Sequence, residues 1–209
     1  MRRRVRQHVN PLSQKYQSPP PPPDWSSVYA IAHQPLHLDI GSARGLFLLD
    51  MAQQQPDWNF LGLEIRQPLV EQAEGDRQHL GLTNLHFVFC NANNSVRSLL
   101  ASLPKGVLQR VTIQFPDPWF KKRHQKRRVV QPELVAELAD YLVPNGQVLL
   151  QSDIEAVAKD MVDRFVEHPA FERQGDDWLL ENSLPVQTER ETVTLSQGKP
   201  VYRAVFTRI

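Results

Sequence analysis

From about residue 35 onward, short apolar runs alternate with longer amphipathic ones, and this alternation constrains the fold more than any other feature of the chain. Repeated strand and helix units of this kind build a parallel sheet covered by helices on both faces, an α/β fold. We predict strands over 36–40, 59–65, 85–90, 110–115 and 147–152, with a last strand within 201–209. We predict helices over about 45–54, 67–80, 95–102, 132–142 and 153–167. Ser152 and Asp153 offer groups that could cap the last of these helices.

An unbroken proline run, Pro19–Pro23, divides the chain into two parts. Such a run favours polyproline II and cannot lie inside a helix or a central strand. The residues before it include few large apolar side chains, so we expect 1–24 to form a basic N-terminal arm with a proline-rich linker, either mobile or packed on the main body. Residues 25–209 are expected to form one domain, because the full length of 209 residues suits a single hydrophobic core.

Composition excludes several classes of protein. The 41% hydrophobic and 22% charged residues are close to globular averages, and no apolar run approaches the roughly 18 residues of a membrane span. Cys90 is the single cysteine, so neither an intramolecular disulfide nor a multi-cysteine metal site can form. The seven histidines show no ligand-like spacing, and we expect no metal. A cytoplasmic location fits these features, no obligate protein partner is indicated, and the choice between monomer and homodimer stays undetermined.

The net charge of +1 conceals a segregated charge distribution. Residues 121–128 carry six fixed positive charges and no acid, whereas 133–181 carry twelve acids against three Lys or Arg. Further cations lie in the N-terminal arm at Arg2, Arg3, Arg4, Arg6 and Lys15. A chain segregated in this way can present a basic surface to a polyanion, although a solvated face with a loose tail would give the same pattern.

Polar residues follow three successive predicted strands. The segment from Asp39 to Gly45 joins the first strand to the first helix, and its glycines allow a ligand to approach the backbone and the helix N-terminus. Glu64 ends the second strand, where an acid can accept hydrogen bonds from both hydroxyls of a ribose. Asn91 and Ala92 follow the third strand and can contact an adenine edge. Together these positions predict a crevice for an adenosine-containing ligand.

The segment after the fourth strand, Phe115–Phe120, reads Phe-Pro-Asp-Pro-Trp-Phe. Phe115 and Asp117 each precede a proline, which steers both toward extended backbone and fixes the Asp117 carboxylate on a rigid loop. The loop runs directly into the basic residues 121–128. An acid, aromatic side chains and a cationic strip make a plausible base pocket beside a phosphate track, with Trp119 equally suited to the core or to base stacking.

These motifs resemble those of the bacterial tRNA (guanine-N7-)-methyltransferases of the TrmB family. The resemblance spans roughly residues 35–207, and its most specific motif is FPDPW-x-K-x-RH-x-KRR at 115–128. The other matching segments are LDIGSARGLFL (38–48), FLGLEIR (60–66), LLQSD (149–153), TERE (188–191) and RQHVNPL (6–12) of the arm. The resemblance implies a Rossmann-like class I methyltransferase fold, S-adenosylmethionine as cofactor, tRNA as partner, and methylation of guanosine 46 in the variable loop.

The resemblance also implies roles for individual residues. Asp117 would be the catalytic, guanine-facing acid and would contact the cofactor as well. The cofactor-binding set would further include Asp39, Gly41, Gly45, Glu64, Asn91 and Ala92. The substrate-binding set would be Lys121, Asp153, Thr188 and Glu191. RNA phosphates would be contacted by Lys122, Arg123, Lys126, Arg127 and Arg128.

Three positions depart from the family pattern. Ala43 occupies an inner position of a loop that is usually richer in glycine, Asp39 stands where Glu is more common, and Asn91 replaces the usual Asp. Each remains small or able to hydrogen bond, so we expect weaker cofactor affinity rather than loss of binding. Two other readings stay open: a nicotinamide-dependent oxidoreductase, for which G-x-G-x-x-G is missing, and a non-catalytic RNA-binding protein, which would leave Glu64 and Asp117 without a purpose.

Overall fold

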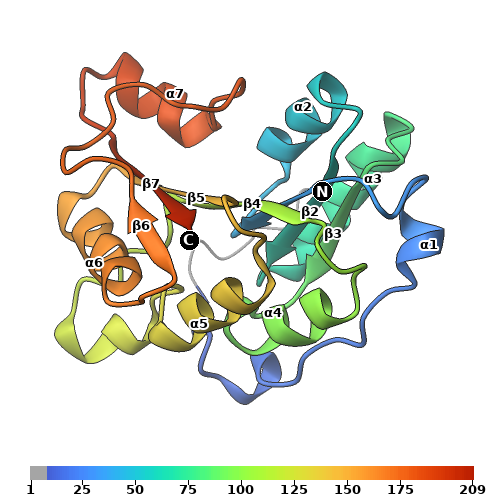
Figure 1. Ribbon diagram of the computed structural model, residues 1–209, viewed down its shortest axis with the longest axis horizontal. Helices are drawn as coiled ribbons and strands as arrows, with labels where there is room; N and C mark the ends of the chain where they lie inside the picture. The colour runs from blue at the N-terminus through green and yellow to red at the C-terminus, as the bar shows by residue number, and fades with distance from the viewer. Residues whose placement is uncertain (1–8) are drawn as a thin grey trace.

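A seven-stranded sheet forms the centre of the molecule in the computed structural model, which describes residues 9–209 (Figure 1). Its strands are β1 (Leu36–Ile40), β2 (Asn59–Glu64), β3 (Leu85–Phe89), β4 (Leu108–Gln114), β5 (Gln147–Ser152), β6 (Phe171–Arg173) and β7 (Tyr202–Arg208). Their order across the sheet is β3-β2-β1-β4-β5-β7-β6. The first five strands are mutually parallel, whereas β7 pairs antiparallel with both β5 and β6. The predicted α/β class and its six strands are confirmed; β6, only three residues long, was not predicted.

Helices cover both faces of the sheet (Figure 1). They are α1 (Trp25–Val28), α2 (Leu46–Gln54), α3 (Gln67–His79), α4 (Ala92–Ala101), α5 (Pro132–Tyr141), α6 (Glu155–Val166) and α7 (Glu189–Ser196), with 3-10 turns η1 (Gln14–Tyr16) and η2 (Lys122–Arg127). Two apolar clusters result, one under α2 and α3 and a larger one under α4, α5 and α6. The five predicted helices are present, while the short α1 and α7 were not predicted.

Strands β1 and β2 are buried along their whole length because helices lie on both sides of the sheet. All five residues of β1 and all six of β2 are buried, including the polar His37, Asp39 and Glu64. Strand order reverses between β1 and β4, so the connections that leave these two strands separate from each other. In a sheet of this kind, the carboxyl ends of the strands at such a reversal form the usual ligand crevice.

The described part of the N-terminal arm packs against the main body. The Asn91 side chain donates to the Pro11 carbonyl (3.2 Å), and the Asn94 side chain donates to the Tyr16 carbonyl (2.8 Å). The Tyr16 ring meets Phe89 edge-on, with ring centroids 6.3 Å apart. The arm therefore lies on the carboxyl end of β3 and the start of α4. Its cations Arg2, Arg3, Arg4 and Arg6 fall outside the described residues.

The expected caps of α6 are only partly present. The helix begins at Glu155 after Ile154, and no side chain caps its first turn. The Ser152 hydroxyl accepts a bond from the Ile154 amide (3.1 Å), whereas the Asp153 carboxylate bonds Arg190 instead. Asp153 is therefore turned toward α7 and away from the helix that it was expected to cap.

Within residues 9–209, no helix combines the length and apolar character that crossing a bilayer requires. The same range contains no group of three His, Cys, Asp or Glu side chains placed to hold a metal ion.

Candidate active site

Two adjoining cavities open at the carboxyl ends of the parallel strands. The smaller one has a volume of about 130 Å³ and the larger one about 640 Å³. Both are lined by Gly41, Arg66, Gln114, Phe115, Pro116 and Asp117. These residues lie at or just after the ends of β1, β2 and β4. The two cavities therefore meet where the strand order reverses between β1 and β4.

The smaller cavity collects most of the residues predicted to bind a cofactor. Gly41, Glu64, Asn91, Ala92 and Asp117 all line it. Gly41 has φ of +91° and open space where a Cβ would stand, so a ligand can approach its backbone closely. In contrast, Gly45 lines neither cavity. A Cβ there would lie 2.4 Å from the Phe87 ring, and its φ of +75° starts α2, so this glycine serves packing and backbone geometry rather than ligand contact.

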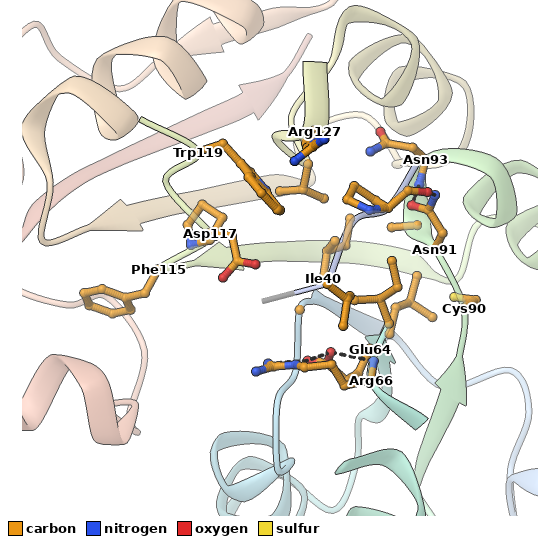
Figure 2. A pocket seen from close by; sticks show the side chains of 18 of the residues that line it. Ile40, Glu64, Arg66, Cys90, Asn91, Asn93, Phe115, Asp117, Trp119 and Arg127 are labelled. Atoms are coloured by element: carbon orange, nitrogen blue, oxygen red, sulfur yellow. Dashed lines mark hydrogen bonds and ion pairs between the residues drawn. The ribbon is translucent and has the colours of Figure 1, made fainter. Parts of the chain in front are cut away.

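Glu64 is buried and held in place by four hydrogen bonds. Its carboxylate accepts from the Ala43 amide (2.9 Å), the Arg66 amide (2.9 Å) and the Arg66 guanidinium (2.9 and 3.0 Å), as Figure 2 shows in part. Burial opposes the charge of Arg66, but its bonds to Glu64 and the nearby charge of Asp117 outweigh that effect and raise the pKa of Arg66. Sequence reasoning did not select Arg66, although it lies two positions after Glu64.

Asp39 lies deeper, on the side of the larger cavity. Its carboxylate accepts from Thr112 Oγ1 (2.6 Å) and from the Gln114 amide (3.4 Å). Burial raises the pKa of Asp39 to about 6, the nearby Glu64 adds to this rise, and the two hydrogen bonds oppose it. Below Thr112, the buried His37 has a strongly lowered pKa because of burial, so it stays neutral and contributes no charge to the site.

The N-terminal arm forms part of the wall of the smaller cavity. Val9 and Pro11 line it beside Asn91, whose Oδ1 caps α4 through the Asn93 amide (3.3 Å). Two polar atoms at this cavity, Asn93 Oδ1 and Arg127 Nε, are buried and have no hydrogen-bond partner among the described residues. Because Asn93 Oδ1 can accept and Arg127 Nε can donate a hydrogen bond, a polar ligand in this cavity can satisfy both atoms.

The loop after β4 directs Asp117 toward both cavities, and Figure 2 shows its carboxylate facing Glu64 and Arg66 across the smaller one. The backbone differs from the sequence prediction: Phe115 has φ of +48° and Trp119 has φ of +42°, so Phe115 is left-handed rather than extended. The Phe115 amide nevertheless donates to the Gln151 carbonyl (2.8 Å), which continues the ladder to β5. Left-handed backbone at a residue before proline is costly and is typical of functional loops.

The basic strip divides into an exposed and an inward-facing part. Lys121, Lys122, Arg123 and Lys126 are exposed, and their predicted contacts with RNA stay a prediction. Arg127 instead lines the smaller cavity and stacks on Trp119, with its guanidinium carbon 5.0 Å from the ring centroid. The pKa of His124 is lowered, first by partial desolvation and then by the charges of Arg127, Arg123 and Lys121.

Arg128 does not fit the predicted role of phosphate contact. Its side chain is buried, donates to the Pro118 carbonyl (3.0 Å) and pairs with Asp160 of α6 (3.0 Å). The arginine therefore fastens the Asp117 loop to α6. Sequence spacing could not separate it from its neighbours, because η2 ends at Arg127 and the chain then turns into the core at Val130.

The larger cavity gains a second wall from α7 and from the loop after β5. Asp153, Thr188, Glu189 and Arg190 line it, and Thr188 caps α7 by accepting from the Glu191 amide (3.1 Å). Arg190 bonds Asp153, and Arg44 pairs with Glu189 (2.5 Å) across the cavity. Glu191 lines neither cavity: it is fully buried beneath Thr188. The T-x-x-E pattern is a capping-box signal that could have predicted α7.

Comparison with known proteins identifies the family. A family model described as "Putative methyltransferase" matches residues 33–204. A tRNA (guanine-N(7)-)-methyltransferase of Trichormus variabilis is 65% identical over 207 residues, covering 99% of this chain and 96% of the relative. The corresponding protein of Microcystis aeruginosa is 61% identical and covers 97% of each chain. The chain belongs to the tRNA (guanine-N7-)-methyltransferase family.

Solved methyltransferases share the fold of this family member at low sequence identity. The aminoglycoside resistance methyltransferase NpmB1 superposes with a TM-score of 0.56 at 17% identity, covering 88% of this chain and 89% of that one. The fold is therefore the class I methyltransferase fold that the sequence motifs implied. In this family member the loops after β1, β2 and β4 line both cavities, whereas the loop after β3 lines the smaller cavity alone.

Proposed function

We propose that the chain transfers a methyl group from S-adenosylmethionine to N7 of a guanosine in tRNA, with the cofactor beside β1, β2 and β3 and the target base against α7. The observation that carries this assignment is that Asp117 lines both cavities at once. One carboxylate is thereby available to the region of the methyl donor and to the region of the acceptor. The family relationship supports the same reaction.

The residues of the smaller cavity suit S-adenosylmethionine, which would supply an electrophilic methyl group on a sulfonium. Glu64 would accept bonds from the ribose hydroxyls, sharing its oxygens with Arg66. Asn91 and Ala92 would border the adenine, and Asn93 Oδ1 would gain a donor. Asp39 lines the larger cavity beside Gly41, which both cavities share, and from there its buried carboxylate would face the cationic amino group.

The proposed reaction requires positioning more than proton transfer. Guanine N7 carries a lone pair and no proton at neutral pH, so a general base is not needed to create the nucleophile. The cofactor would supply the methyl group, and its transfer, in which an N7–C bond would replace the S–C bond, would leave the positive charge on the purine ring. A fixed Asp117 carboxylate can hold the base in line and favour that charge. Alignment of the reacting atoms can contribute about 7–11 kcal/mol to lowering the barrier.

On the RNA side, Lys121 and the exposed cations of η2 would bind phosphates and fix the register of the tRNA. The arm would extend this track through Arg2, Arg3, Arg4 and Arg6, which makes 1–24 a functional segment attached to the domain formed by 25–209. We further propose guanosine 46 of the variable loop as the target and the cytoplasm as the place of action.

The deciding experiment incubates unmodified tRNA with the pure protein and methyl-labelled S-adenosylmethionine, then maps the labelled nucleotide. We expect 7-methylguanosine at position 46, and label at another nucleotide would refute that position. Binding of both tRNA and cofactor without any label would support the non-catalytic RNA-binding reading instead. Titration with a nicotinamide dinucleotide in parallel tests the oxidoreductase reading, for which saturable tight binding would be the supporting result.

A further inference from the structure

A row of polar side chains, all buried except the half-buried Gln114, crosses the sheet at the floor of the two cavities. It connects β1 to α7 through Asp39, Thr112, Gln114, Gln151, Arg203 and Glu191. Strand register creates the row, because Asp39 is paired with Thr112, Gln114 with Gln151, and Gln151 with Arg203. Buried polar groups are costly unless they are satisfied, so a row of this length calls for a function.

Arg203 lies near the α7 end of this row, and each of its three guanidinium nitrogens donates a hydrogen bond. The guanidinium donates to Glu191 Oε1 (2.7 Å), to Gln151 Oε1 (3.0 Å) and to the Leu180 carbonyl (2.9 Å). The Arg203 side chain is 3% exposed and that of Glu191 is fully buried. The ion pair is therefore shielded from water, unlike the pairs on the surface of the molecule.

Glu191 uses both carboxylate oxygens within the protein. Oε1 pairs with Arg203, while Oε2 accepts from Gln151 (3.1 Å) and from Asn182 (2.8 Å). Family resemblance implies that Glu191 binds substrate, but in this arrangement it could reach a nucleotide only by leaving these partners. Its geometry is that of an anchor for α7.

The part of α7 that this anchor holds is the part that faces the larger cavity. Thr188 and Arg190 line that cavity, and Thr188 bonds the amide of Glu191 directly (3.1 Å). The other ties of the helix start are Arg44–Glu189, exposed on both sides (48% and 57%), and Arg190–Asp153, whose arginine is 60% exposed and whose acid is 15% exposed. Exposed pairs contribute little to holding a segment in place, so the buried pair determines where α7 begins.

We propose that Arg203 is a positioning residue for tRNA methylation: through Glu191 it places Thr188 and Arg190 against the target nucleoside. The inference rests on the proposed function, since it takes the larger cavity as the site of the target base. Arg203 itself touches neither cavity and contacts no reacting atom. Its effect is on the shape of the tRNA side of the site, while the smaller cavity is built from other strands.

A double-mutant cycle tests the proposal, using Arg203→Gln, Glu191→Gln and the double variant. We expect each single change to lower kcat/KM for tRNA about 30-fold, mostly through KM, because a displaced wall loses the alignment of the substrate. The Kd of S-adenosylmethionine should stay within about two-fold of the wild-type value in all variants. The double variant should be no worse than the worse single variant, because both changes remove the same anchor.

Arg208→Gln is the matched control, because it removes an arginine from the same strand whose side chain donates to the Ala139 carbonyl (3.1 Å), away from α7. It should leave the kinetics unchanged. Should Arg203→Gln fail to fold, Arg203→Lys keeps the charge but not the three-way contact, and is expected to raise KM for tRNA several-fold. Wild-type KM in Arg203→Lys, or losses that multiply in the double variant, would overturn the proposal. Absence of tRNA methylation by the wild-type protein would instead refute the proposed function.

Discussion

The two cavities of the site are built in different ways. The walls of the smaller one come mainly from loops that directly follow β1, β2 and β3, and its buried Glu64 carboxylate is already held by hydrogen bonds. The larger cavity depends on α7, which lies about 150 residues after the loop that follows β1. Two ion pairs with exposed arginines join α7 to the opposite wall of this cavity. The difference indicates that the cofactor side is preformed, whereas the tRNA side relies on one buried anchor and can adjust around it.

Asp117 stands where the two cavities meet, so its replacement should have the largest effect. We expect Asp117→Asn to lower kcat by about 100- to 1,000-fold, the range seen when one preorganised electrostatic contact is removed. The Kd of S-adenosylmethionine, measured by calorimetry, should change far less, because Glu64 and Asn91 remain. Asp176→Asn, a change of an exposed acid outside both cavities, is the control. Equal turnover in Asp117→Asn and wild type would remove this carboxylate from the mechanism.

The variant Arg128→Gln tests whether the Asp117 loop, which lines both cavities, has to be attached to α6. Arg128→Gln leaves Asp160 without its partner and frees the Pro118 carbonyl, so we expect the free energy of unfolding to fall by about 2–3 kcal/mol, less than for a fully buried pair because Asp160 is 27% exposed. Denaturant titration measures this change. Binding of tRNA should keep its salt dependence, and a slope reduced by about one unit would show that Arg128 contacts a phosphate after all.

Local patterns in the sequence predicted the preformed side of the site well. Strand ends could be located from apolar runs, and Glu64, Asn91 and Asp117 all lie where these runs placed them. The remaining features depend on tertiary contacts that spacing does not encode. Arg127 and Arg128 read as two more cations of a strip, yet one packs on Trp119 and the other pairs with Asp160. Glu191 carries a substrate motif, but its burial became visible only once β7 placed Arg203 beside it.

Acidity should affect cofactor binding through Asp39, which lines the larger cavity beside the shared Gly41. Its pKa of about 6 exceeds the usual 3.8, and a cationic group on the cofactor favours the ionised carboxylate, so binding should weaken as the pH falls below 6. From pH 7 to pH 5 we expect the Kd of S-adenosylmethionine to rise about ten-fold by proton linkage. Of the groups around Asp39, Thr112 and Gln114 do not titrate here, His37 stays neutral, and the charge of Glu64 adds to the raised pKa of Asp39. Asp39→Asn should give weaker binding that no longer varies over this range.

Protein stability should respond to the same group in the opposite direction. Because the folded pKa of Asp39 is raised, its contribution to stability is complete below pH 3.8 and is lost as the pH rises toward 6. Chemical denaturation of the cofactor-free wild type and Asp39→Asn between pH 4 and 7 measures this difference. We expect the cofactor affinity to rise with pH while the contribution of Asp39 to stability falls. Opposite trends of this kind would distinguish a role of Asp39 in binding from a general effect of unfolding.

The smallest effect is expected from a single exposed cation on the adjustable side. Lys122→Gln removes one charge from η2, where the side chain is exposed, so tRNA affinity should fall about three-fold at 0.1 M salt and the slope of log K against log salt should decrease by about 0.7–0.9. Lys105→Gln removes a lysine from the far end of the sheet, beside Gly106, and should change neither quantity. Since phosphate contacts fix register without choosing the base, kcat at saturating tRNA should be retained in Lys122→Gln. A large loss of kcat would mean that η2 shapes the site around Asp117. The tRNA side would then not be independent of the preformed cofactor side at the point where the two cavities meet.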